Sequence, residues 1–342
     1  MRLLSTLYVA DHQARVGVQS RSLLVRLGDG RRQRVPIETI DSVVLVGHGQ
    51  ISSDALALCT DRRVAVTALA RSGRVRFRSG GGVTGNVLLR QRQFRAADNP
   101  DVALDVSRVI VAGKLANAQR LLRRWTWDAP IKTRRALSRL GTQVRRQVDA
   151  VWEARSLDHV RGCEGNGARA YFECLRLHLA GVRPDLAFES RTRRPPRDEV
   201  NACLSYCYGL ALAELTGAVE GVGLDPAVGF LHGVRPGRPA LALDLLEEAR
   251  IAVVDRFVVR IVGRRIIGPE DFVSAVGGGK YLSDSGRAQL LIAWEEYRTE
   301  EIRHELLDRS LPRAALSIVQ ATLMARFLRG DLPSYAPYVM PG

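Results

Sequence analysis

The chain has 342 residues, 46% of them hydrophobic, and a formal net charge of +15 at pH 7. This length accommodates two domains with cores of their own, and the hydrophobic share excludes a disordered chain. No run of about 18 apolar residues occurs and the N-terminus lacks an export signal, so we expect a cytoplasmic protein without a membrane partner. So basic a chain indicates a polyanionic partner, with nucleic acid the leading candidate.

Residues 1–78 predict a small β-rich domain. Short aliphatic and β-branched runs alternate with turn signals, as in SLLVRL before Gly28-Asp29-Gly30 and in SVVLVG. Residues 52–60 favour a short helix capped by Ser53 or Asp54, and a hairpin with Ser72-Gly73 at its turn follows.

A glycine-rich linker is predicted next, over residues 79–100, because its first seven residues, SGGGVTG, cannot hold regular structure. Beyond it the apolar period changes from two to 3.6, which predicts a larger all-α C-terminal domain over residues 101–330 and an irregular tail over 331–342. The expected fold class is therefore α+β. The predicted helices span residues 102–124, 133–154, 168–179, 199–219, 240–258, 283–308 and 312–329.

Cysteine and lysine are both uncommon in the chain. The five cysteines are odd in number and lack any CxxC spacing, so we expect reduced core residues and no disulfide or zinc framework. Nearly all basic residues are arginine, and the chain's lysines are Lys114, Lys132 and Lys280.

A histidine among acids is the most informative local pattern. His232 lies twelve residues before Asp244 and fifteen before Glu247. Pro239 can begin a helix, which puts Asp244 and Glu247 on one face at i and i+3, in a stripe that is otherwise apolar. Two such carboxylates repel by about 3 kcal/mol at an effective dielectric near 20, a term that a bound divalent cation reverses. An exposed acidic run paired with Arg250 is the alternative, and spacing alone leaves both open.

Glu164 offers a third oxygen ligand. It precedes Gly165 and a helix start that Asn166 can cap. Together with His232 and Glu247, and with Asp244 beside them, it would form an oxygen-rich site with one imidazole, which suits Mg²⁺ or Mn²⁺ better than zinc. Hard ligands and open coordination positions are typical of phosphodiester chemistry.

These residues resemble a known family: the integrase and endonuclease that is the first of the CRISPR-associated proteins. The resemblance covers the whole chain, and the opening MRLLSTLYV with GNVLLRQRQFR is similar to the type I-C branch. Its other motifs are CEGNGARAYF around Glu164, GFLH with His232, LALDLLEEAR with Asp244 and Glu247, and TRRPPRDEVNACLSYCYGL.

The resemblance implies an N-terminal β domain joined to a helical domain, and a catalytic metal held by Glu164, His232 and Glu247. Asp244 matches a further acidic position in the same helix. Many relatives have Asp where this chain has Glu247, so the division of roles between Asp244 and Glu247 stays open.

The resemblance also implies an activity and partners. The 3′-OH of a short foreign duplex attacks a phosphodiester in the repeat array, which inserts a new spacer in prokaryotic antiviral immunity. The implied assembly is a homodimer, two of which hold a dimer of the small second adaptation protein, and the type I-C branch adds a helper exonuclease. Double-stranded DNA, both incoming and repeat, is the substrate.

Arginines near these motifs are expected to bind the DNA backbone. Arg191, Arg193, Arg194 and Arg197 form a loop stiffened by two prolines, and Arg235 and Arg238 lie close to His232. Two other functions stay open: a non-catalytic DNA-binding scaffold of the same adaptation complex, and a metal-dependent phosphoesterase that acts on small molecules.

Overall fold

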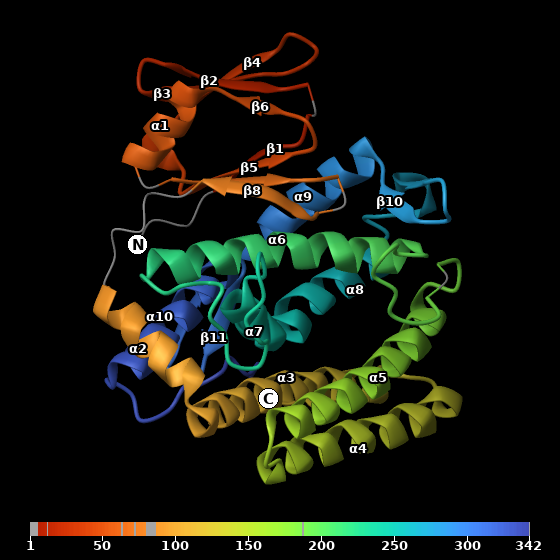
Figure 1. Ribbon diagram of the computed structural model, residues 1–342. Helices are drawn as coiled ribbons and strands as arrows, with labels where there is room; N and C mark the ends of the chain where they lie inside the picture. Colours follow the sequence, from red (N-terminus) through yellow and green to blue (C-terminus); the bar gives the residue numbers. More distant parts are fainter. Residues whose placement is uncertain are drawn as a thin grey trace.

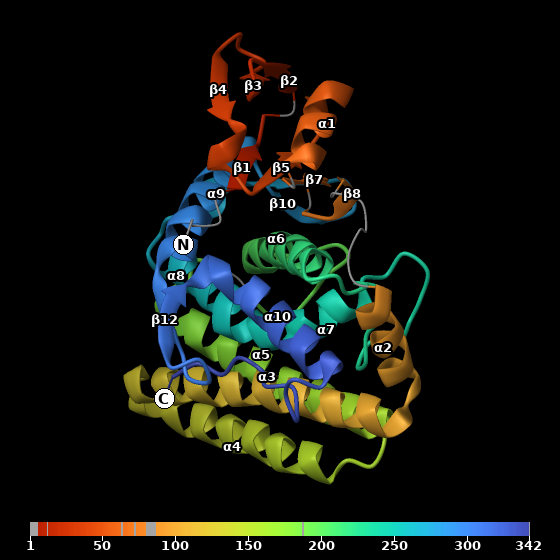
Figure 2. The ribbon, with the colours of Figure 1, turned by 90° about the vertical axis from the view of Figure 1, so that its left-hand side faces the viewer.

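The computed structural model describes residues 6–11, 13–62, 64–71, 73–79, 87–186 and 188–341. Figure 1 shows a small β-rich region stacked on a larger, mostly helical one. The view turned by 90° shows the same two tiers, with the sheet that contains β8 facing helix α6 (Figure 2). A β-rich region followed by a helical one is the predicted fold class, and it is confirmed.

The β-rich region consists of two sheets with a short helix beside them. In the first, β1, β5 and β7 run parallel and β8 is antiparallel; in the second, β4, β3 and β2 are antiparallel and β6 joins β2 in parallel. The helix α1 (Ser53–Asp61) begins after Ser52, whose side chain accepts from the Ala55 N–H, one residue earlier than the predicted cap. The strands are β1 (Thr6–Val9), β2 (Arg15–Gln19), β3 (Ser22–Arg26), β4 (Arg32–Pro36), β5 (Ser42–Val46), β6 (Gln50–Ile51), β7 (Ala65–Leu69) and β8 (Val75–Ser79).

Strand β5 joins the two regions because both of its faces are buried. Val43 and Leu45 belong to the core between the sheets, whereas Val44 and Val46 pack into the helical core. A strand covered on both sides needs a continuous apolar run, which SVVLV supplies. The two predicted domains therefore pack directly on each other through this sheet.

The helical region is built on α3 and α6, both long and largely buried. Local signals start its helices: Asn99 caps α3 ahead of Pro100, and Asp198 caps α6. The helices are α2 (Val87–Asp98), α3 (Pro100–Asp128), α4 (Ile131–Glu153), α5 (Leu157–Val182), α6 (Glu199–Gly221), α7 (Ala240–Ala249), a π-helical turn η2 (Arg250–Asp255), α8 (Arg256–Gly263), α9 (Asp284–Thr299) and α10 (Leu316–Arg329).

Helix α5 begins eleven residues before its predicted start at residue 168, so Glu164 lies inside the helix and not ahead of it. Ser156, not Asn166, caps it by accepting from the His159 N–H. The glycines of CEGNG suggested a helix start, but packing overrides their low helix propensity. At Gly167 a Cβ would lie 2.3 Å from the Leu115 side chain, so the glycine permits close approach of α5 to α3.

The C-terminal region is not all-α, which corrects the prediction. In the described chain it carries two β-hairpins, and the second replaces the end of the helix predicted over residues 283–308. The predicted linker also differs: residues 80–86 lie outside the described residues, and residues 87–98 form α2. The hairpin strands are β9 (Phe272–Ser274), β10 (Lys280–Leu282), β11 (Glu301–His304) and β12 (Arg309–Pro312).

Helix α6 lies between the β-rich region and the other helices. Among the described helices it alone is long and apolar enough to cross a membrane, yet most of it is buried, as in a core helix. Gly209 of α6 meets Gly73 of the β7–β8 turn so closely that a Cβ on Gly209 would lie 2.1 Å from the Gly73 carbonyl oxygen. The five cysteines are free and buried, as predicted.

Candidate active site

Asp244, on α7, is fully buried beneath the loop that carries His232. Its Oδ2 accepts hydrogen bonds from the backbone N–H groups of Phe230 (2.6 Å) and Leu231 (3.1 Å), and its Oδ1 accepts one from the His232 N–H (2.9 Å). Gly229 is needed at the entry to this loop, because a Cβ there would lie 2.7 Å from the Asp244 carboxylate. Burial raises the pKa of Asp244 and the hydrogen bond with His232 opposes that rise. Asp244 therefore shapes the histidine loop.

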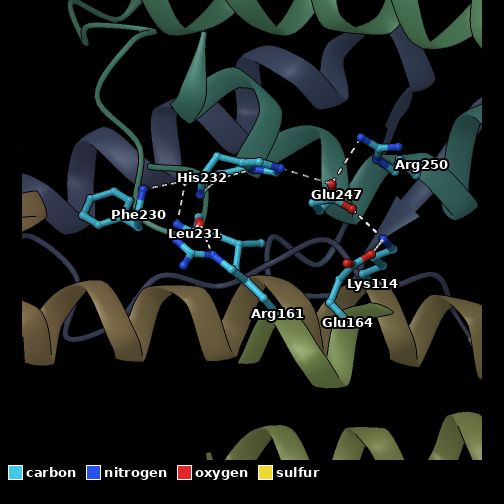
Figure 3. Close-up of polar contacts among 9 residues, drawn as sticks. Lys114, Arg161, Glu164, Phe230, Leu231, His232, Glu247 and Arg250 are labelled. Atoms are coloured by element: carbon cyan, nitrogen blue, oxygen red, sulfur yellow. Dashed lines mark hydrogen bonds and ion pairs between the residues drawn. The ribbon is translucent and has the colours of Figure 1, made fainter. Parts of the chain in front are cut away.

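The imidazole of His232 is oriented by the same carboxylate. Its Nδ1 lies 2.7 Å from Asp244 Oδ1, so Nδ1 carries the proton of the neutral ring and Nε2 keeps its lone pair. Nε2 lies 3.8 Å from Glu247 Oε1, and Figure 3 shows the ring extending from the loop toward that residue. A histidine that donates one ring N–H to a carboxylate has the usual arrangement of a metal-binding histidine.

Lys114 of α3 lies between the two glutamates. Its ammonium donates to Glu164 Oε1 on α5 and to Glu247 Oε2 on α7, the latter at 2.6 Å (Figure 3). Lys114 and Glu247 are buried, whereas the Glu164 side chain is 28% exposed. Three helices thus converge on one small cluster of charges.

Arg250 supplies a second cation. Its guanidinium lies 3.2 Å from Glu247 Oε1 and 4.8 Å from the centre of the Tyr208 ring. Burial by itself would raise the pKa of Glu247, but Arg250 and Lys114, with His232, outweigh it and hold that pKa at about 2. Glu247 is therefore ionised at neutral pH.

Glu248 faces the other side of α7 and contacts the C-terminal tail. Its carboxylate accepts from the Tyr335 hydroxyl, the Gln320 amide (3.1 Å) and the backbone N–H of Tyr338 (2.7 Å). None of these donors is charged, so burial dominates and raises the pKa of Glu248 to about 7. The tail is irregular, as predicted, but Tyr335 and Tyr338 are buried in the core.

These side chains are of the types that bind divalent metals, and the Lys114 ammonium lies between two of them. No group of three or more His, Cys, Asp or Glu side chains within the described residues is arranged to hold a metal ion as it stands. Yet Glu164 and Glu247 already share a cation, and Nε2 of His232 faces the same carboxylate. Two hard oxygen donors and one imidazole match Mg²⁺ or Mn²⁺.

The structure brings together Glu164, His232, Asp244 and Glu247, the residues singled out in the sequence. The acids are not the exposed run of the alternative interpretation, since Asp244 and Glu247 are buried. The sequence reasoning missed Lys114 and the role of Arg250 inside the cluster. A signal for Lys114 was present: it is one of three lysines in an arginine-rich chain, and it is the one charged residue in the largely apolar stretch IVAGKLANA.

A basic cleft of about 1390 Å³ opens beside His232, between the β7–β8 hairpin and α6. This volume exceeds the range of about 300–1000 Å³ typical of small-molecule sites. Glu220 is the single acidic residue among its described lining. The arginines that line it are Arg71, Arg74, Arg76, Arg78, Arg191, Arg193, Arg194, Arg235, Arg238 and Arg250.

The predicted DNA-binding arginines take different positions. Arg193, Arg194, Arg235 and Arg238 line the cleft, whereas Arg197 is exposed and does not line it. Arg191 lines the cleft too, but its guanidinium donates to Asn201 Oδ1 (2.8 Å) and Ser205 Oγ (3.1 Å).

The fold is shared with solved structures of low sequence identity. A casposase bound to its integration product matches with a TM-score of 0.87 at 19% identity, covering 97% of this chain and 93% of the other. A CAS1 protein from Thermotoga maritima matches with a TM-score of 0.81 at 20% identity over 99% of both chains. The chain also resembles part of a Cas6-RT-Cas1–Cas2 complex, with a TM-score of 0.83 at 19% identity, over 99% of this chain and 36% of that one.

Curated relatives are closer in sequence. CRISPR-associated endonuclease Cas1 2 of Rhodospirillum rubrum is 38% identical, and CRISPR-associated endonuclease Cas1 1 of Moorella thermoacetica is 35% identical, each over 98% of both chains. A fusion of the CRISPR-associated exonuclease Cas4 and endonuclease Cas1 from R. rubrum is 34% identical over 97% of this chain and 57% of the fusion. The family model for CRISPR associated protein Cas1 matches residues 7–296. With the fold, the sequence relatives and the family model in agreement, the chain belongs to the Cas1 family of CRISPR-associated endonucleases.

Proposed function

We propose that this protein is a metal-dependent DNA endonuclease and integrase that inserts short foreign duplexes into a CRISPR array, using Mg²⁺ or Mn²⁺ held by Glu164, His232 and Glu247. The observation that carries the proposal is that Asp244 orients His232 so that its Nε2 lies 3.8 Å from Glu247, while Lys114 links Glu247 to Glu164. A metal bound there would stabilise charge on the scissile phosphate and lower the pKa of the attacking hydroxyl.

In the proposed reaction, a new bond forms between the 3′ oxygen of the incoming strand and phosphorus, and the phosphodiester bond of the repeat breaks. The attacking hydroxyl loses a proton and the released 3′ oxygen gains one, so the number of phosphodiester bonds stays constant and no external energy source is needed. Asp244 would keep His232 oriented throughout, because it binds both the ring and the loop backbone.

The basic cleft would hold the reacting DNA strand. Arg235 and Arg238 extend from the histidine loop, and Arg193 and Arg194 face them from the loop before α6. Phosphate contacts of this kind position DNA without reading its sequence. Strong salt dependence of DNA binding is therefore expected.

Partners follow from the relatives by analogy. The fusion with the Cas4 exonuclease supports a helper exonuclease, and the complex of Cas1 with Cas2 supports the small second adaptation protein. We propose a homodimer as the unit that binds this second protein, and membership of the type I-C branch.

A non-catalytic scaffold is the alternative, and the Lys114 ion pairs favour it because they satisfy the carboxylates without metal. Two test variants with matched controls decide between the functions. Glu164→Gln is compared with Glu173→Gln on the same helix. His232→Ala is compared with His159→Ala, which changes an exposed histidine of α5.

Strand joining with Mn²⁺ should fall by at least about 100-fold in Glu164→Gln and His232→Ala. DNA binding should be unchanged in both, and the two control variants should keep full activity. Unaltered strand joining in Glu164→Gln and His232→Ala would reject the integrase and leave the scaffold.

A further inference from the structure

The α3–α4 hairpin carries a basic surface that is separate from the cleft. Figures 1 and 2 both place α4 on the side of the helical region remote from the β-rich region, and no residue of α3 or α4 lines the cleft in the described chain. The exposed basic residues of this surface are Arg123 and Arg124 near the end of α3, and Lys132, Arg134, Arg135, Arg139, Arg145 and Arg146 along α4.

None of these cations forms an ion pair with any carboxylate that the structure describes. Elsewhere on the helices arginines commonly pair with an acid one turn away, as Arg161 does with Asp158 (2.8 Å) and Arg176 with Glu173 (2.7 Å). On the hairpin the exposed acids are Asp101, Asp105, Asp128, Asp149 and Glu153, fewer than the eight cations. The mutual repulsion of the arginines therefore remains until an anionic partner binds.

A groove runs between the two helices within this surface. It has a volume of about 670 Å³ and is lined by Arg123, Arg134 and Arg145, by short polar side chains and Gln119, and by the apolar side chains of Leu122, Trp127 and Leu137. Gly141 lies in its wall, in the middle of α4, where a glycine weakens a helix; a Cβ there would meet nothing within 4 Å, so packing does not require it. Trp127, 83% exposed, borders the groove. The backbone at Gly141 is open to a ligand that approaches closely.

We propose that the outer face of the α3–α4 hairpin binds a second stretch of duplex DNA through its phosphates, in addition to the strand held in the cleft. The need for two stretches rests on the proposed function, because strand transfer joins two DNA segments. The dimensions agree: α4 has 23 residues, or about 35 Å at about 1.5 Å per residue, close to one turn of B-DNA at about 34 Å.

The test compares two variants that remove the same charge. The hairpin variant carries Arg135→Gln, Arg139→Gln, Arg145→Gln and Arg146→Gln. The control carries Arg15→Gln, Arg21→Gln, Arg26→Gln and Arg32→Gln, at exposed sites of the β-rich region. Binding of a duplex whose ends are closed by hairpin loops is measured by fluorescence anisotropy over a salt series, with EDTA present so that no metal is involved.

The hairpin variant should bind this duplex at least about tenfold more weakly. The slope of log K plotted against log salt concentration should also be shallower by about 3 to 4, because each lost phosphate contact reduces it by about 0.9. The control should lose less than about threefold. Arg139→Gln alone should reduce the slope by about 0.9, and it shows whether a poorly folded fourfold variant caused the loss.

Equal losses in hairpin variant and control would overturn the proposal, because affinity would then follow net charge. Unchanged DNA affinity in the hairpin variant would overturn it too; the surface would then bind an acidic protein or be solvated. Failure of the proposed function is seen separately: it appears as retained strand joining in Glu164→Gln, whereas the metal-free binding test does not depend on that outcome.

Discussion

Glu247 and Glu248 are neighbours in the sequence, yet α7 directs them into opposite surroundings. Glu247 faces Lys114, Arg250 and His232, and the two cations Arg250 and Lys114 do most to hold its pKa at about 2. Among the described residues, the hydrogen-bond donors to Glu248 are uncharged and belong mainly to the C-terminal tail, and its pKa rises to about 7. Burial is nearly the same for both, so the charge of the neighbours decides which carboxylate is ionised.

The two residues mark two faces of α7: Glu247 lies on the face that we propose is reactive, and Glu248 lies on a structural face. The ionised carboxylate lies with Glu164 and His232, where the proposed metal would take the place of the Lys114 ammonium. The other carboxylate fastens the tail against α7, and Asn117 of α3 adds to this by accepting from the Met340 N–H (2.8 Å). The tail thus braces the two helices that carry Glu247 and Lys114.

Removing the negative charge of Glu247 should do the most damage to activity. Glu247→Gln should reduce strand joining by about 1000-fold, equivalent to about 4 kcal/mol, because it removes one anionic ligand of the proposed metal. Glu248→Gln should change the rate by less than about tenfold. The measurement is strand transfer with Mn²⁺ at matched protein concentrations, and similar rates for the two variants would remove the distinction between the faces.

Lys114→Met removes the ammonium group that lies between Glu164 and Glu247. It leaves Glu247 buried with one strong partner fewer and removes the ion pair of Glu164, so the metal-free protein should lose about 3 kcal/mol of unfolding free energy. Added Mn²⁺ should recover much of this loss, and Mn²⁺ should bind Lys114→Met more tightly than wild type, as followed by electron paramagnetic resonance. Lys132→Met, exposed on α4, is the control and should change stability by less than about 0.5 kcal/mol. A Lys114→Met protein as stable as wild type would contradict the prediction.

Glu247 and Glu248 should make the free energy of unfolding depend on pH in opposite directions. Because the folded pKa of Glu248 is raised from 4.5 to about 7, its stabilising contribution is full below about pH 4.5 and is lost as pH rises to about 7. Glu247 behaves oppositely: its contribution is full above pH 4.5 and is lost as pH falls toward 2.

Glu248→Gln stays uncharged and should abolish the loss between pH 4.5 and 7, a change on the order of 3 kcal/mol in urea unfolding with EDTA. An identical pH profile for Glu248→Gln and wild type would count against a raised pKa in the folded protein.

The smallest expected effect concerns orientation. Asp244→Asn must turn an amide N–H₂ toward either the Phe230 and Leu231 N–H groups or His232, so one set of hydrogen bonds is lost. Mn²⁺ affinity should fall by about 10- to 100-fold, as for other carboxylates that orient a metal-binding histidine. The His232 ring resonances in NMR spectra should shift as well, which loss of an uninvolved acid would not cause.

Much of the fold could be predicted from the sequence, because its signals are local. The period change, the caps Asn99 and Asp198, and the apolar run SVVLV set the class and most helices. The start of α5 could not be predicted, since close packing at Gly167 outweighs glycine's low helix propensity. The β11–β12 hairpin was missed for a similar reason: its short strands pair with each other and pack on the core, a contact that no local pattern records.

For the site, the identity and spacing of the candidate residues could be taken from the chain alone: Glu164 and His232, with Asp244 and Glu247 one turn apart on a helix. The surroundings of each residue arise in the folded protein. Folding turned Asp244 toward the histidine loop and Glu248 toward the tail, and it brought Lys114 between residues 50 and 133 positions away in the sequence. The physical reason is that residue type and helical period are properties of a short segment, whereas the charge that surrounds a buried carboxylate comes from distant segments that meet only when the chain folds.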